Sequence, residues 1–269
     1  MLSTIDWTRP WFRPFAASAS RLHGADLCEA LNAEASGSRN ARGLPLRFVP
    51  QDCLPEGVAY EAHIFATGQV PTRDNLHDAF NALIWLHFPE TKRLLNRLQA
   101  EAIEQDGVQA VRGGLRDAAT LFDENAVILI CEDPGIADAL RGFAWQELFV
   151  SRRDVWREAC AVMPFGHALL EKLVQPYKSV TAHAWWISAS PATPLDVLDR
   201  LLVASLADAA EQGRLKGGRS FAPLPVLGIP GWSDENADPG FYDDASVFRP
   251  GRRNTAPLPG HADRQPHRC

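Results

Sequence analysis

Long apolar segments are missing from this 269-residue chain. No apolar run reaches the roughly 18 to 20 residues that a transmembrane helix needs. The N-terminus carries an acid, Asp6, where a secretory signal would carry basic residues, and no apolar stretch follows it. We therefore expect a soluble, cytoplasmic protein without a membrane partner.

Paired cysteines are also missing, because the five cysteines are odd in number, far apart and never arranged as CxxC. They are Cys28, Cys53, Cys131, Cys160 and Cys269. Such spacing argues against a zinc knuckle, a redox dithiol and a disulfide framework. Most of these cysteines are therefore predicted to be small buried apolar residues.

The common enzyme signatures are absent as well. Without GxGxxG, a P-loop, GxSxG, HExxH or an EF-hand pattern, nucleotide-binding and α/β-hydrolase interpretations lose their main support. The net charge of −6 argues against a broad nucleic-acid-binding surface. Residues 251–269 are the exception, since they are rich in Arg, Pro and Gly. We expect them to form a disordered basic tail that is either solvated or in contact with an acidic partner.

The composition that is present suits a folded domain, with 46% hydrophobic and 22% charged residues. The chain shows no internal repeat and no regular alternation of strands and helices. These features favour an α+β fold, with mixed helices around a small, mostly antiparallel sheet. We expect one globular domain over residues 23–250, with residues 1–22 as an extended arm laid on its core.

Hydrophobic periodicity and capping residues predict the individual elements. Helices are predicted at residues 25–35, 72–88, 90–105, 164–174 and 193–213. Strands are predicted at residues 46–49, 60–66, 126–131 and 180–187. The run AVILIC at 126–131 is continuous and apolar, which is typical of a strand buried on both faces. Residues 217–250 hold many prolines, glycines and aromatics and are predicted to wrap the surface without regular structure.

The predicted helix 72–88, with Thr72 as its N-cap, carries a polar stripe on a largely apolar body. The stripe consists of Asp74, His77, Asp78 and Asn81, at spacings of three and four residues. Buried polar groups are costly unless each finds a partner. Two interpretations stay open: the stripe is the helix N-terminus reaching solvent, or it lines the floor of a cleft.

A second group of acids precedes the buried strand, where Asp117 is followed by an Asp-Glu-Asn triplet at residues 123–125. Carboxylates in this position could ligate Mg²⁺ or Mn²⁺, which prefer oxygen ligands. The alternative is an ordinary charged turn, with Arg116 and Asp117 in a salt bridge.

Histidines supply the third group. His167 and Glu171 share a face of the predicted helix 164–174, a spacing that suits either a metal or a base held by a carboxylate. The alternative is a surface ion pair. Gly166 leaves room for a close neighbour. His183 lies among apolar residues of a predicted strand, where a histidine is commonly a hydrogen-bonded core residue.

If these elements pack together, His77, His167 and His183 could bind Zn²⁺, Mn²⁺, Fe²⁺ or Mg²⁺. The leading hypothesis is a metal-assisted or acid–base hydrolase, in which a metal activates water and a carboxylate accepts its proton; its substrate class is open, and a small molecule is one possibility. Its candidate catalytic residues are His77, Asp78, Asp117, His167, Glu171 and His183. The alternatives are a non-enzymatic binding or scaffold protein that uses the aromatic-rich C-terminal segment, and a buried polar network without a ligand.

Several blocks, taken in order, resemble a proteobacterial family of unknown function, domain of unknown function 3025. The blocks are residues 71–89, 115–125, 165–173, 181–183 and 223–232, and the similarity runs from about Trp7 to Pro250. In that family a glycine often follows the Asp-Glu-Asn triplet, whereas this chain has Ala126, which argues against a tight turn with positive φ. The resemblance implies a single extended domain and assigns no activity.

Overall fold

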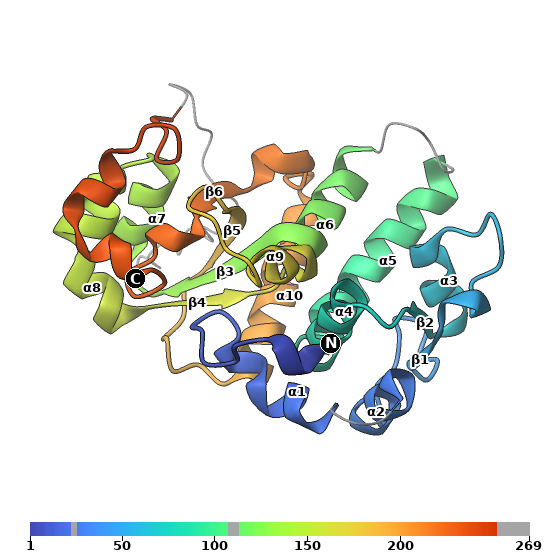
Figure 1. The fold of residues 1–269 in the computed structure, drawn as a ribbon. Helices are drawn as coiled ribbons and strands as arrows, with labels where there is room; N and C mark the ends of the chain where they lie inside the picture. The colour runs from blue at the N-terminus through green and yellow to red at the C-terminus, as the bar shows by residue number, and fades with distance from the viewer. Residues whose placement is uncertain (23–25, 107–112, 252–269) are drawn as a thin grey trace, which may run out of the picture.

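A four-stranded sheet organises the centre of the molecule (Figure 1). In the computed structural model, which describes residues 1–22, 26–106 and 113–251, the strand order is β4-β3-β5-β6. The strands are β3 (Ala126–Cys131), β4 (Cys160–Pro164), β5 (Thr181–Ile187) and β6 (Ala222–Pro225). β3 runs antiparallel to β4 and parallel to β5, and β5 runs antiparallel to β6. The predicted α+β fold with a small, mostly antiparallel sheet is therefore confirmed.

β3 is the most buried strand of this sheet. It has a neighbour on each edge, and all six of its residues are buried, as the continuous apolar run predicted. Ala126, its first residue, has φ −89° and ψ 156°, an ordinary extended conformation that any residue adopts. The chain therefore passes from helix to strand at this point without needing a glycine.

The helices surround the sheet and extend beyond it on the side of the early residues (Figure 1). They are α1 (Ala16–Arg21), α2 (Leu27–Glu34), α3 (Tyr60–Thr67), α4 (Leu76–His87), α5 (Pro89–Asp106), α6 (Gly114–Asn125), α7 (Pro134–Arg141), α8 (Arg153–Ala159), α9 (His167–Lys172) and α10 (Leu195–Glu211). Strands β1 (Arg47–Pro50) and β2 (Gln69–Thr72) form a separate parallel pair. Within the described residues, no helix combines the length and the apolarity that crossing a membrane requires.

The predicted strand at residues 60–66 is wrong, because this segment forms helix α3. An apolar alternation over seven residues is too short to separate the period of a strand from that of a helix. His63 and Ile64, which are adjacent, are both buried, as happens on a helix packed on a broad face. Gly68, with φ +75°, ends the helix in the left-handed conformation that glycine adopts without strain.

Three element boundaries also differ from the prediction. Thr72 ends β2, and the side chain of Asn75 caps α4 by accepting a hydrogen bond from the Asp78 amide. The expected turn at 123–125 is the last turn of α6. Helix α9 begins only at His167, because the residues up to Pro164 belong to β4. Each correction bears on the position of a candidate site residue.

The two ends of the described chain contribute to the core. Residues 1–22 form short helical turns and α1, not an extended arm, and Trp11, Phe12 and Phe15 are buried. The Phe12 ring stacks on Phe80 of α4, with centroids 5.6 Å apart. The prediction that residues 217–250 lack regular structure is wrong, because the segment contains strand β6 and four short 3-10 helices between Gly217 and Asp243. Its large aromatic side chains are buried, namely Phe221, Trp232, Phe241, Tyr242 and Phe248. The predicted tail beyond residue 251 lies outside the described residues.

Candidate metal centre

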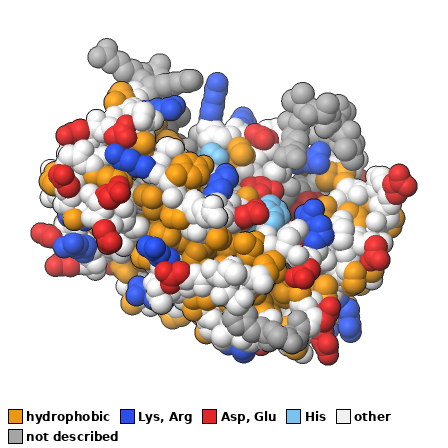
Figure 2. Space-filling model, in the orientation of Figure 1, with side chains coloured by type: hydrophobic (Ala, Val, Ile, Leu, Met, Phe, Trp, Pro, Cys, Tyr) orange, Lys and Arg blue, Asp and Glu red, His pale blue; other side chains and the backbone are white. Residues whose placement is uncertain are grey.

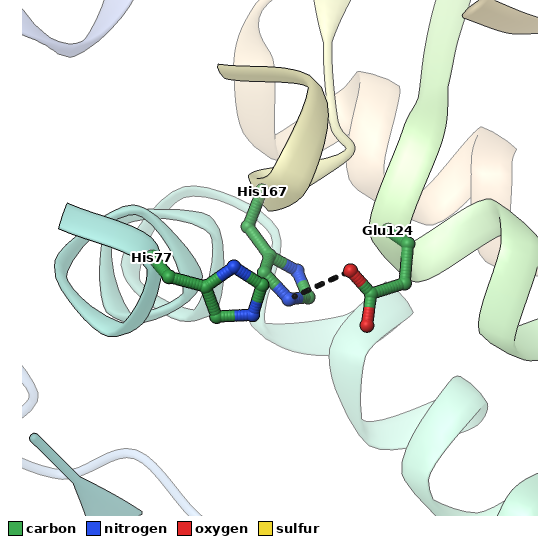
Figure 3. A group of neighbouring side chains, drawn as sticks. All are labelled: His77, Glu124 and His167. Atoms are coloured by element: carbon green, nitrogen blue, oxygen red, sulfur yellow. Dashed lines mark ion pairs between the residues drawn. The ribbon is translucent and has the colours of Figure 1, made fainter. Parts of the chain in front are cut away.

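Three side chains from three helices meet beside the sheet (Figure 3). His77 comes from α4, Glu124 from α6 and His167 from α9, and one ligand atom of each lies within 4.8 Å of the others. The two imidazole rings meet edge to face, with centroids 4.5 Å apart. His167 Nε2 lies 3.5 Å from Glu124 Oε2. We refer to His77, Glu124 and His167 as the donor group.

The junction between α6 and β3 brings Glu124 and His167 together. The amides of Phe165 and Gly166 both donate to the carbonyl of Ala126, which ties the start of α9 to the end of α6. A Cβ atom on Gly166 would lie 2.5 Å from backbone atoms of Glu124 and Asn125. The expectation that Gly166 admits a close neighbour is therefore confirmed, since only glycine allows this approach.

Helix α4 carries His77 to the same place, because it packs against α9. His77 Nδ1 lies 3.0 Å from Glu171 Oε2, so Glu171 pairs with His77 and not, as predicted, with His167 on its own helix. The side chains of His77 and Glu171 are 31% and 46% exposed, whereas His167 is buried. In Figure 2, histidine atoms reach the surface beside acidic side chains in the middle of the face shown. The Glu124 side chain is 40% exposed, so the donor group joins one buried side chain, His167, to two that solvent reaches, His77 and Glu124.

A buried charged layer lies behind the donor group. Lys92 donates to Asp123 over 2.5 Å and to the side-chain oxygen of Asn81 over 2.8 Å. Asn81 in turn donates to the hydroxyl of Tyr60. Asp123 Oδ2 lies 3.9 Å from His167 Nδ1, a distance beyond a hydrogen bond. This layer fixes Asp123 next to the imidazole of His167.

His167 is neutral in this environment. Its pKa falls from 6.5 to about 4, chiefly because burial disfavours the charged ring, and the charges of Lys92 and His77 act in the same direction. The carboxylate of Asp123 opposes that shift without cancelling it. Among the described residues, the buried Nδ1 atom of His167 has no hydrogen-bond partner. A neutral histidine is in the protonation state that a metal ligand requires, and its Nε2 atom is the one that faces Glu124.

The remaining predicted site residues lie elsewhere. His183 is not part of the donor group; its ring lies 5.3 Å from Phe221, and burial and then Lys172 lower its pKa while Asp117 raises it. Asp117 belongs to the first turn of α6 and Glu124 to the last, about 10 Å apart along the helix axis. The predicted set of three histidines is thus replaced by two histidines and a glutamate.

Asp78 has a local role in the turn before α4. Its two carboxylate oxygens accept hydrogen bonds from the guanidinium of Arg73, and one also accepts the Arg73 backbone amide. Burial raises the pKa of Asp78, but these hydrogen bonds outweigh burial and leave the pKa below its usual value. The predicted polar stripe therefore divides, since Asp78 and Asn81 bond to other protein groups and His77 belongs to the donor group.

The sequence indicated the acids before the buried strand as possible metal ligands, but Glu124 was not among the candidate catalytic residues, and the buried pairing of Asp123 with Lys92 was not predicted. Two acids directly before a buried strand were the available signal for the first two, although a turn was predicted there. For Lys92 the signal is its position three residues before Leu95, which places a charge on the apolar face of the predicted helix 90–105. A charge on that face requires a buried partner.

The fold and the donor group define an α+β protein with a potential His-Glu-His metal centre. The chain belongs to the family described as Protein of unknown function (DUF3025), whose model matches residues 46–252. That range contains the whole donor group and the charged layer behind it. Neither the curated proteins nor the solved structures give a significant match to this chain.

Proposed function

We propose that this protein binds one divalent metal ion through His77, Glu124 and His167 and is a metal-assisted hydrolase. The observation that carries the proposal is the convergence of these three ligand atoms within 4.8 Å from helices far apart in sequence. Two imidazole nitrogens and one carboxylate form a ligand set of catalytic zinc, which leaves a coordination position for water. Such a metal lowers the pKa of the water bound to it.

The charges near the donor group favour a cation. Glu124, Glu171 and Asp123 lie within 4 Å of the two histidines, and Lys92 is paired with Asp123. The Nε2 atom of His167, 3.5 Å from Glu124 Oε2, is the ring nitrogen that faces the donor group, whereas Nδ1 faces Asp123. Glu171 contacts His77 but is not one of the three ligands. Its proposed role is to hold the His77 ring in place and to accept a proton from the metal-bound water.

The alternative, a scaffold protein that binds through the aromatic-rich C-terminal segment, depends on side chains that are buried here. Trp232, Phe241, Tyr242 and Phe248 are each less than 10% exposed. Asp244 accepts bonds from the backbone and hydroxyl of Ser246 and pairs with Lys178, so it anchors this segment. We therefore favour the hydrolase.

The test is metal binding by protein purified without an affinity tag. Titration with Zn²⁺, Mn²⁺, Fe²⁺ and Mg²⁺ is expected to show one site for at least one of these ions. His77→Ala, His167→Ala and Glu124→Gln should each weaken binding by at least about tenfold, because each removes a ligand. His183→Ala is the matched control and should bind as wild type does.

Hydrolysis of ester and phosphoester reporter substrates is then measured with and without the bound ion. Wild type that takes up none of the four ions, and gains no thermal stability from them, would contradict the metal centre. Equal losses in His183→Ala and His77→Ala would instead place the metal elsewhere. If wild type binds the metal with full affinity but hydrolyses none of the substrates, the proposed metal site stands and the proposed hydrolase activity is refuted.

A further inference from the structure

The sheet brings together two cysteines that lie 29 residues apart in the chain. Cys131 ends β3 and Cys160 begins β4, and the two are direct partners in the antiparallel register. Their sulfur atoms are 3.2 Å apart, and both are free thiols. The sequence spacing predicted no redox dithiol, and only strand pairing creates this one.

The backbone already has the geometry of a disulfide. Directly opposed residues of an antiparallel pair have Cα atoms about 4.5 or 5.5 Å apart, and both values lie within the 4.4–6.8 Å range of disulfides. Opposed side chains also project from the same face of the sheet. Small side-chain rotations would bring the sulfurs from 3.2 Å to the bonded distance of about 2.05 Å.

One of the two sulfurs is accessible to a small oxidant. Cys160 is partly exposed and lines a groove of about 410 Å³ together with Arg157 of α8 and Trp232. Cys131 is fully buried beneath it, and its sulfur lies 3.7 Å from the carbonyl of Asp133. An oxidant entering the groove would therefore meet Cys160 first, with Cys131 in position to resolve the product.

We propose that Cys131 and Cys160 form an intramolecular disulfide when the folded protein reacts with hydrogen peroxide. The Cys160 thiolate attacks peroxide, which gives a sulfenic acid and one water. The sulfur of Cys131 then displaces the hydroxyl group, which leaves as a second water, and the disulfide forms. The two cysteines lose two electrons in all, and one peroxide is reduced to two waters.

The reaction is slow at neutral pH for a physical reason. Burial and the hydrogen bond to Cys131 both raise the pKa of the Cys160 thiol, so little thiolate is present. The pair is therefore a modification site for sustained oxidation and not a rapid peroxide sensor. This inference is independent of the donor group, which contains no cysteine.

The test treats folded, full-length wild type with hydrogen peroxide, removes the peroxide, unfolds the protein in N-ethylmaleimide and maps unreduced peptides by mass spectrometry. A peptide joining Cys131 to Cys160, lighter by two hydrogens and cleaved by dithiothreitol, is the expected product. Alkylation at these two positions should be lost. The exposed Cys53 serves as an internal measure of unspecific oxidation.

Two results would overturn the proposal. One is full alkylation of Cys131 and Cys160 after a treatment that oxidises Cys53. The other is equal formation of the Cys131–Cys160 link in protein oxidised in urea, which would mean that the folded sheet does not direct it. Cys160→Ala should abolish the linked peptide, and the matched control Cys53→Ala should leave it unchanged.

Discussion

Replacing Lys92 by methionine should strongly destabilise the protein, because it leaves a buried acid without its partner. The side chains of Lys92 and Asp123 are 4% and 9% exposed, so solvent screens their interaction little. Breaking a buried ion pair by removing one partner typically costs about 3–5 kcal/mol, since the remaining charge is uncompensated. Lys92 also donates to Asn81, which loses that bond as well. We expect Lys92→Met to lose about 3–5 kcal/mol of unfolding free energy.

Urea denaturation followed by circular dichroism measures this loss. The matched control is Arg200→Met, which breaks an ion pair with Asp196 whose side chains are 61% and 70% exposed. An exposed pair of this type contributes between about 0 and 1 kcal/mol. The control should therefore differ from wild type by no more than this amount.

A double-mutant cycle separates the charge from the shape of the side chain. Asp123→Asn should also be destabilising, but adding it to Lys92→Met removes the orphaned charge. The double variant is therefore expected to lose clearly less than the sum of the two single losses. If Lys92→Met costs less than about 1 kcal/mol, or if the losses are additive, the pair is not the desolvated contact described above.

Three further predictions concern neighbouring features. Gly166→Ala should lower the unfolding free energy measured in urea by about 1–3 kcal/mol, because the new Cβ atom meets the backbone of Asn125. The control is Gly114→Ala, whose Cβ atom meets nothing closer than 3.5 Å. Equal losses in the two variants would refute the close approach at Gly166. The pKa of His167 is about 4 in the folded protein and 6.5 in the unfolded chain. The neutral ring therefore contributes roughly 3 kcal/mol to the unfolding free energy above pH 6.5, and this contribution is lost as the pH falls from 6.5 through 4, because the unfolded chain takes up the proton first. His167→Asn should flatten that part of the stability–pH curve, and an unchanged curve would contradict the shift. Asn236→Ala should lose about 2–4 kcal/mol, since Asn236 donates to two buried carbonyls, and a loss under about 0.5 kcal/mol would mean that water replaces it.

Segments whose pattern extends over many residues were predictable from the sequence. The run AVILIC could only be a buried strand or a short buried helix, and its length favoured the strand that the structure contains. The long amphipathic helices α5 and α10 also lie where their periodicity placed them. In such segments the local pattern and the tertiary packing require the same conformation.

The candidate site was predictable only in part. His77, His167 and Glu171 were identified as chemically competent residues on core elements, and Gly166 as a point of close approach. Glu124 was not selected, because at the sequence level the triplet that contains it is indistinguishable from a charged turn. Its position in the last turn of α6 depends on where that helix ends against β3.

What the sequence determines by itself is the residue types and the face of each element that they occupy, because these follow from local periodicity and side-chain chemistry. Only the tertiary structure decides which faces meet. It selects Glu124 over His183 as the neighbour of the two histidines, and it places Cys131 opposite Cys160. Contacts between residues far apart in sequence depend on strand register and helix packing, and no local pattern encodes them.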